Sequence, residues 1–403
     1  MEFRTITEGE FDAFFVALSN AFGEALPDEE ETAADRQLAE LDRTFAAFDD
    51  GRIVGCAAVL SQQMVVPGGG TVPTAGVTMV GVLPTHRRRG ILRELMDRML
   101  TQAVQRGEPV ATLFASQAAI YGRFGYASTA GHLAFDIALD RISWAVEPPA
   151  GRVRLVPREE ALPIMQAIYD RAIRQRAGGI VQDDDVFPIS FREPAKREEK
   201  PFYAIRENAA GEPDAFAIYR NKHRWPRGLP SVVLKVQRLV ATSPDGSQAI
   251  WRFLFDVDLV SRVTAYGRPV DDPLLLQVQE PRALRPELDD GLFLRTLDLP
   301  AAWQARRYAA DGTVTLAVDD PVRPESGGTF ELRVEDGAAT CRRIDATPDV
   351  SCTIHASGAT YLGGTTWGAM AAAGLADERV PGALERLDAM FQTQLAPWPI
   401  VYF

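Results

Sequence analysis

One stretch of this chain constrains its fold more than any other: an apolar run, a short basic turn and an amphipathic segment follow one another within residues 76–104. The run Val77 to Leu83 is apolar and rich in β-branched residues, which favours a strand, and Pro84 ends it because proline cannot donate to a strand ladder. The turn holds three arginines and Gly90. A strand that leads through such a turn into a helix gathers backbone N–H groups and the positive end of a helix dipole, which is how proteins bind phosphate. The stretch therefore predicts a site for a phosphate-bearing cofactor.

The segment after Gly90 predicts a helix with one buried face, because its apolar residues recur at spacings of three and four. Those residues are Ile91, Leu92, Leu95, Met96, Met99, Leu100 and Val104. Gly90 has no side chain, so an anion can approach the main chain there, while Arg87 to Arg89 raise the local positive potential. A basic, solvated helix start is the alternative interpretation of the same residues.

The turn also resembles a known family motif. Residues Arg87 to Leu92 are similar to the coenzyme A pyrophosphate loop of the GNAT acetyltransferases, whose pattern is Gln/Arg-x-x-Gly-x-Gly/Ala. Leu92 departs from this pattern, since it stands where the family has glycine or alanine. The resemblance implies that acetyl-CoA lies against the strand and on the loop. The residues it assigns to the cofactor are Val80, Gly81, Val82, Arg88, Arg89, Gly90, Ile91, Leu92 and Arg93.

A second motif follows that helix. Residues Val110 to Ala115 predict a buried strand, and residues Ser116 to Tyr126 predict a short helix that ends at a glycine. This resembles the GNAT segment in which a tyrosine precedes a terminal Gly-aromatic pair. The resemblance implies that Tyr121 protonates the departing coenzyme A thiolate, with Ser116 and Gln117 beside the pantetheine arm. A phenol has a pKa near ~10 and a thiol near ~8.5, so Tyr121 is protonated at neutral pH. The alternative is that Tyr121 is a packed aromatic.

The two motifs and the length of 403 residues together resemble one actinobacterial branch of the GNATs, the enhanced intracellular survival (Eis) acetyltransferases. The motifs run from Pro84 to Gly90 and from Ile120 to Tyr126, and Tyr126 is the second candidate for the acid. The resemblance implies an α/β (α+β) fold in which tandem GNAT-like domains precede a sterol-carrier-protein-like domain. The expected limits are 1–147 for the acetyl-CoA-binding domain, 148–290 for a GNAT-like domain without a cofactor loop, and 291–403 for the C-terminal domain. The family also implies a homohexamer.

The end of the sequence, Ala396 to Phe403, is apolar and aromatic and contains two prolines, which predicts a stiff, buried segment. In the family that this chain resembles, the general base is the carboxylate of the last residue, which here is Phe403. A terminal carboxylate has a reference pKa of about 3.3–3.7, and desolvation would raise it and make it a better proton acceptor. The alternative is an edge strand that closes a sheet.

The charge of the chain points to a cationic substrate. A formal net charge of −12 and a pI of about 5.0 oppose nucleic-acid binding, which needs a basic surface. The acidic run Asp28 to Glu31, together with Glu24, lies where GNAT enzymes build part of the acceptor site, and Phe22 is expected to reach the same pocket. A solvated face is the alternative for the acidic run. The expected acceptor is an amine of an aminoglycoside-like molecule, a polyamine or a lysine.

Other residue patterns narrow the class of protein. The three cysteines and four histidines have no metal-ligand spacing, so no metal is expected. No run of about 18 apolar residues and no secretion signal is present, which favours a cytoplasmic protein without a membrane role. We therefore expect an acetyl-CoA-dependent N-acetyltransferase that works by direct transfer. The alternative is a non-catalytic coenzyme A- or lipid-binding module with a degenerate acetyltransferase domain.

Overall fold

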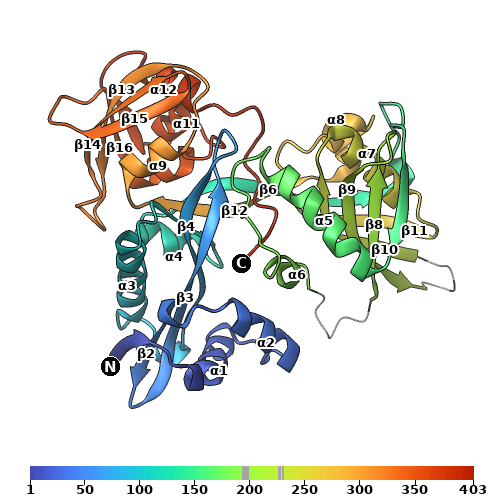
Figure 1. Ribbon diagram of the computed structural model, residues 1–403, viewed down its shortest axis with the longest axis horizontal. Helices are drawn as coiled ribbons and strands as arrows, with labels where there is room; N and C mark the ends of the chain where they lie inside the picture. Colours follow the sequence, from blue (N-terminus) through green and yellow to red (C-terminus); the bar gives the residue numbers. More distant parts are fainter. Residues whose placement is uncertain (193–198, 226–227, 229–230) are drawn as a thin grey trace. The chain divides into compact units, whose positions relative to one another are not determined.

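The computed structural model describes residues 1–192, 199–225, 228 and 231–403 (Figure 1). The chain forms two compact units. Unit 1 consists of Met1–Thr129, Leu292–Thr393 and Tyr402–Phe403, and unit 2 consists of Ala130–Gly291 and Gln394–Val401. Unit 1 is therefore assembled from both ends of the sequence. Among the described residues, no helix is both long and apolar enough to cross a membrane.

The first part of unit 1 is a twisted sheet with helices. In spatial order its strands are β1 (Glu2–Thr5), β2 (Thr44–Asp49), β3 (Arg52–Val65), β4 (Thr71–Val82), β5 (Val110–Phe114) and β12 (Glu287–Thr296). Its helices are α1 (Phe11–Phe22), α2 (Glu29–Leu38), α3 (Ile91–Gln105) and α4 (Ala118–Tyr121), with single 3-10 turns η1 (Glu8–Glu10), η2 (Leu41–Arg43), η3 (Pro84–His86) and η4 (Gly122–Phe124). Strands β4 and β5 are parallel, and β12 pairs with the other edge of β5 in the antiparallel sense.

Helix α3 lies along the long β3–β4 hairpin (Figure 1) and supplies one side of the main core of unit 1. The predicted helix is confirmed, and its buried face contains Ile91, Leu95, Met96, Met99 and Leu100 as expected. The expectation for Val104 is wrong, because its side chain is 41% exposed and Ala103 is buried instead. The buried face fixes α3 on the sheet, which in turn fixes the loop at its N-terminus.

The C-terminal part of unit 1 is a second sheet with helices packed on it (Figure 1). Its strands, in spatial order, are β15 (Ala338–Arg343), β14 (Gly328–Glu335), β13 (Gly312–Asp319), β16 (Val350–Thr353) and β17 (Ala376–Glu378), and its helices are α9 (Leu299–Ala305), α10 (Ile354–Thr360), α11 (Trp367–Ala372) and α12 (Ala383–Phe391). The stretch Ala359–Ala373 is rich in alanine, and its sequence predicts one helix. The structure instead separates α10 from α11, since Gly363 adopts a φ of 82°, which does not continue a right-handed helix.

Unit 2 is a second mixed sheet with its own aromatic core, in which Phe135 meets Trp251 in a T-shaped arrangement and Phe255 packs against Trp251 at a tilt. In spatial order its strands are β6 (Ala127–Ala138), β11 (Val260–Arg268), β10 (Ser231–Ala241), β9 (Pro213–Arg224), β8 (Pro201–Glu207) and β7 (Arg152–Val156). Its helices are α5 (Arg158–Ile173), α6 (Phe187–Ser190), α7 (Pro244–Phe255) and α8 (Leu274–Gln277), with 3-10 turns η5 (Leu139–Arg141) and η7 (Pro281–Leu284). The first three residues of β6 belong to unit 1, as does the second half of β12.

Candidate active site

Strands β4 and β5 separate partway along their length. Their parallel pairing covers only Thr74–Gly76 on β4 and Val110–Thr112 on β5, whereas β4 continues to Val82 and β5 to Phe114. Beyond this point the edge of β4 that faces β5 has backbone N–H and C=O groups without a strand partner. Unpaired backbone groups of this kind are ready to hydrogen-bond an extended ligand. The predicted cofactor residues Val80, Gly81 and Val82 all lie on this free stretch.

A β-bulge reshapes the same stretch. Met79 has a φ of 54°, in the left-handed region, and the register between β3 and β4 shifts by one residue between Cys56 and Ala58. The extra residue on β4 bends the strand and re-aims the groups that follow it. Bulges and left-handed non-glycine residues cluster at functional sites. The sequence contains no signal for this bulge, since methionine has no preference for that conformation.

The turn after β4 forms an open cradle at the N-terminus of α3. Gly90 is the N-cap residue with a φ of 83°, and a Cβ placed on it would meet nothing within 4 Å. Arg88 also has a positive φ, 64°, and the side chains of Arg87, Arg88 and Arg89 are exposed. Helix α3 has 15 residues, so its dipole is well developed at this end. Room at Gly90, the helix end and the exposed arginines together fit a diphosphate.

Not every predicted loop residue offers a side chain to this cradle. Ile91 is buried in the core, and Leu92 packs partly buried against the same cluster. These two residues can therefore contribute only their backbone groups. Arg93 is exposed. The side chain of Leu92 lies against the core, and this placement explains how the chain accommodates leucine where the family motif has glycine or alanine.

Tyr121 lies at the end of the short helix α4, which follows β5 along the chain. Its ring is buried in the core of unit 1, and it meets the ring of Tyr126 at 6.3 Å in an edge-on arrangement. Burial raises the pKa of Tyr121, and a hydrogen bond from the Ser116 side chain opposes part of that rise. Two predicted site residues are thus brought together. Gln117, in contrast, is exposed as the N-cap of α4.

Tyr126, the second candidate for the acid, is deeply buried, and desolvation raises the pKa of its phenol strongly. Its hydroxyl has no hydrogen-bond partner among the described residues. A phenol that is enclosed in this way has no route to a ligand. The geometry therefore favours Tyr121 over Tyr126 as a proton donor.

Helix α1 approaches the free part of β4 from the side. A Cβ on Gly81 would lie 2.9 Å from the Cβ of Ala21 and 3.6 Å from the ring of Phe22. Glycine at position 81 therefore allows the helix to lie close to the strand, and it brings Phe22 beside the predicted cofactor stretch. The Phe22 side chain remains 46% exposed.

The acidic run has a structural role that the sequence analysis did not foresee. Asp28 is the N-cap of α2, where its carboxylate accepts from the Glu31 backbone N–H at 2.9 Å, and the Glu31 side chain accepts from the Asp28 N–H in return. This is a capping box, which stabilises a helix start. Glu24, which follows the left-handed Gly23 that ends α1, is exposed and outside this arrangement.

The last two residues return to β5. The rings of Tyr402 and Phe403 lie 4.3 Å and 5.2 Å from the ring of Phe114, the final residue of β5. Both end residues are half-buried. Phe114 escaped the sequence analysis, although an aromatic residue at the end of a predicted strand could have suggested a contact. Within the described residues, no group of three or more His, Cys, Asp or Glu side chains is placed to hold a metal ion.

Comparisons with known proteins agree with this architecture. Residues 2–129 and residues 178–296 each match an acetyltransferase (GNAT) domain family, and residues 299–399 match a sterol carrier protein domain family. The expected fold, two GNAT-like domains followed by a sterol-carrier-like domain, is confirmed.

The chain also matches relatives over nearly their whole length. The chain is 34% identical to an N-acetyltransferase of Streptomyces avermitilis over 98% of each chain, and 31% identical to N-acetyltransferase Eis of Mycobacterium tuberculosis over 96% of each chain. Among solved structures, Eis1 from Mycobacterium abscessus aligns over the whole of both chains with a TM-score of 0.88 and 32% identity.

Proposed function

Because this chain belongs to the Eis family of GNAT N-acetyltransferases, we propose that it transfers the acetyl group of acetyl-CoA directly to an amine of a cationic acceptor. Family membership makes it an N-acetyltransferase, and the acceptor, the acid and the base are the proposal. One observation carries it. The separation of β4 from β5 after Gly76 and Thr112 leaves one edge of β4 without a strand partner, and the two diverging strands lead to the Gly90 N-cap of α3 and to the short helix that ends at Tyr121.

The cofactor contacts follow from that space. When bound, acetyl-CoA supplies an acetyl group activated as a thioester. We assign its diphosphate to the backbone and the basic side chains of residues 88–93, because the helix end is open and cationic there. The backbone of Val80, Gly81 and Val82 would hold the pantetheine arm on one side, with Ser116 and Gln117 on the other. Backbone N–H groups of the bulged strand would also donate to the thioester oxygen.

Tyr121 is the proposed general acid. Burial keeps its phenol protonated throughout the neutral range, since it raises the pKa of a group that already ionises near ~10. The proton on the phenol oxygen passes to the sulfur as the carbon–sulfur bond breaks. The thiolate is a better leaving group than the acceptor amine, so the carbon–sulfur bond is the one that breaks, and the phenol proton neutralises the charge that develops on sulfur.

The proposed general base is the carboxylate of Phe403, in a protein whose chain ends at that residue. It accepts one proton from the acceptor ammonium, and the freed amine forms the new carbon–nitrogen bond. The second proton, which the nitrogen loses as the amide forms, restores the one that Tyr121 gives to sulfur. The contact of the Phe403 ring with Phe114 supports this assignment, because it places the last residue at the end of β5. Adding a single residue would carry the carboxylate about 3.5 Å away.

The acceptor side is proposed from charge and exposure. Phe22 is exposed beside Gly81 on the free part of β4, and Glu24 is exposed two residues further along the chain; an aromatic ring and a carboxylate would attract an ammonium group. Aminoglycosides, polyamines and lysine side chains are the proposed classes. We also propose that the protein acts in the cytoplasm as a homohexamer, and that its domains divide near residues 147 and 290, as the family resemblance implies.

The test is release of free thiol from acetyl-CoA by protein with an unmodified C-terminus, against a panel of aminoglycosides, polyamines, lysine peptides and monoamines. We expect turnover with acceptors that carry several amines. A matched protein with one glycine added after Phe403 should bind acetyl-CoA equally well and lose most of its turnover. Full turnover in the extended protein would remove the terminal base, and no turnover with any amine would refute the proposed transfer.

A further inference from the structure

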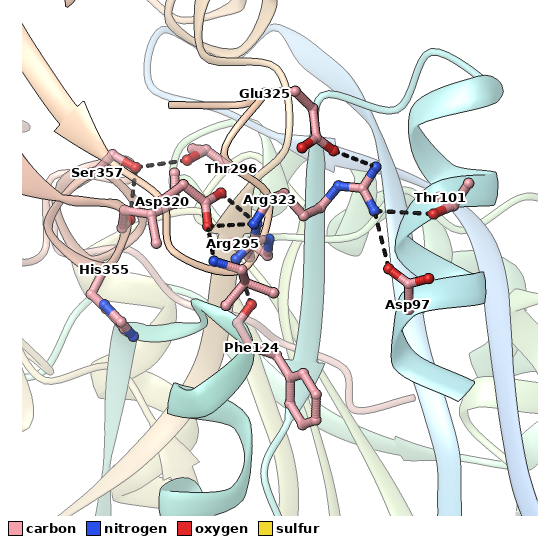
Figure 2. Close-up of polar contacts among 12 residues, drawn as sticks. Asp97, Thr101, Phe124, Arg295, Thr296, Asp320, Arg323, Glu325, His355 and Ser357 are labelled. Carbon is pink, nitrogen blue, oxygen red and sulfur yellow. Dashed lines mark hydrogen bonds and ion pairs between the residues drawn. The ribbon is translucent and has the colours of Figure 1, made fainter. Parts of the chain in front are cut away.

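A buried ion pair lies beside the 3-10 turn η4 (Gly122–Phe124), which directly follows Tyr121 and is called the tyrosine turn below. Arg295 on β12 and Asp320, just after β13, face each other with Nη2 and Oδ2 at 2.5 Å, and both side chains are 0% exposed (Figure 2). The charges are thus removed from water together. Such a pair contributes little net stability compared with an apolar pair, so stability alone does not account for it.

The free end of Arg295 reaches the tyrosine turn itself. Its Nη1 donates to the Phe124 carbonyl at 2.5 Å, and that residue ends η4, which follows Tyr121 directly (Figure 2). Gly125 turns the chain there with a φ of 82°, and a Cβ on it would lie 1.8 Å from Nη1. Glycine at this position is therefore what lets the guanidinium approach the backbone.

A second side chain holds the other end of the same turn. His355 on α10 donates from Nε2 to the Gly122 carbonyl at 2.7 Å, in the tautomer that carries the proton there. The 3-10 turn that begins at Gly122 and ends at Phe124 is thus fastened at both ends by side chains from elsewhere in the chain. Single turns have weak internal hydrogen bonding, so such external bonds determine where they lie.

Asp320 extends the network to α3. Its Oδ1 accepts from the backbone N–H of Val322 and of Arg323, at 3.1 Å and 3.0 Å. The Arg323 guanidinium in turn donates to the Thr101 hydroxyl on α3 at 3.0 Å, with Asp97 at 3.7 Å (Figure 2). One set of polar contacts therefore joins the tyrosine turn to the helix whose N-terminus forms the predicted diphosphate cradle.

We propose that Arg295, oriented by Asp320, is a positioning residue that holds the Phe124 carbonyl and thereby sets the place of the Tyr121 phenol relative to the cofactor loop. The inference rests on the proposed role of Tyr121 as the acid. It assigns the sterol-carrier-like domain, which contributes Asp320 and His355, a part in proton transfer without any contact with substrate.

The test is a double-mutant cycle between the ion pair and the tyrosine. Arg295→Met with Asp320→Asn removes both charges and retains an oxygen that can accept from the backbone N–H groups of Val322 and Arg323. We expect kcat to fall about tenfold with KM for acetyl-CoA changed less than about threefold, because an interaction that places the acid acts in the transition state. In a Tyr121→Phe protein the same two changes should cost less than about twofold, since nothing is left to position.

A matched control comes from unit 2. Arg206 and Asp214 form another buried ion pair, with side chains 3% and 13% exposed. Arg206→Met with Asp214→Asn should lower the melting temperature comparably without lowering kcat. Arg295→Lys keeps a donor for the Phe124 carbonyl and should recover most of kcat.

Two results would be decisive. An equal loss of kcat in the wild-type and Tyr121→Phe proteins would show that Arg295 acts independently of the acid and would overturn the inference. An unchanged kcat for Tyr121→Phe alone would instead refute the proposed acid. If the Arg295→Met protein fails to fold, half-buried His355 provides the same cycle: His355→Ala should lower kcat about threefold, and only when Tyr121 is present.

Discussion

At the scale of single residues, Tyr121 shows how burial prepares a group for chemistry. Desolvation raises the pKa of the phenol, and the Ser116 side chain lowers it in part by bonding to it. A general acid must be protonated, so activity is retained below the raised pKa and lost as the pH rises through it. The alkaline limb of the kcat profile should therefore lie above ~10, the usual pKa of tyrosine.

The first prediction is that Ser116→Ala moves this alkaline limb to higher pH. The change removes the one contact that lowers the pKa of Tyr121, while burial remains. The measurement is kcat against pH in saturating substrates. Tyr121→Phe is the control, and it should lack the limb and lose about 10²- to 10⁴-fold in kcat. A limb that stays in place after Ser116→Ala would show that another group titrates.

The second prediction compares two glycines with nearly the same backbone. Gly90 has a φ of 83° and open space around it, whereas a Cβ on Gly125, with a φ of 82°, would strike the Arg295 guanidinium. Gly90→Ala should therefore cost about 1–2 kcal/mol, the conformational penalty alone. Gly125→Ala should cost more, because Arg295 must also leave the Phe124 carbonyl. Urea unfolding of the two proteins measures the difference, and equal losses would contradict it.

At the scale of elements, local patterns in the sequence located α3 and the strand that became β4, and they placed Tyr121 in a short helix before a glycine. Each of these predictions rests on a run of neighbouring residues, which a sequence displays directly. The bulge at Met79 could not be predicted in this way, because it depends on how β4 pairs with β3. The contacts of Arg295 could not be predicted from the sequence either, since its partners Phe124 and Asp320 lie far from it along the chain.

The third prediction concerns the basic loop as an element. Arg88→Gln should raise KM for acetyl-CoA roughly three- to tenfold with kcat unchanged, because one exposed charge near a helix N-terminus contributes about 0.3–1 kcal/mol or somewhat more. Arg98→Gln is the matched control, since Arg98 lies on α3, the helix that follows the loop, and pairs with Glu94 at 2.7 Å. Added salt should weaken cofactor binding in the wild type and have less effect on the Arg88 variant. A fall in kcat for Arg88→Gln would place that side chain in the chemistry instead.

At the scale of the whole molecule, the acetyltransferase sheet is completed from the far end of the chain. The Leu292–Thr296 half of β12 covers the outer edge of β5, and the sterol-carrier-like domain supplies further contacts at the tip of the β3–β4 hairpin. There Arg307 donates its backbone N–H to the Pro67 carbonyl, and its side chain lies against Gly68. The C-terminal domain is thus a structural part of the catalytic unit.

The fourth prediction is that a fragment of residues 1–147 is insoluble or binds acetyl-CoA poorly when made alone. It would leave β5 as an unprotected edge strand, and such edges pair with other chains. The measurements are the soluble yield and the thermal unfolding of the fragment, followed without tryptophan fluorescence, each compared with that of the full chain. A soluble fragment with full affinity for acetyl-CoA would show that β12 and the C-terminal domain are dispensable for the cofactor site.

This long-range pairing of β12 with β5 also determines when the acetyltransferase sheet can be completed during translation. On the ribosome, β5 emerges well before β12, and all of the main segment of unit 2 is made in between. At 5–20 residues per second, the growing chain would expose the β5 edge for roughly 10–35 s before its partner appears. Unit 2 can gain much of its structure during that interval, whereas the catalytic sheet matures last. Chaperone demand during translation should therefore be concentrated on the half-built acetyltransferase sheet.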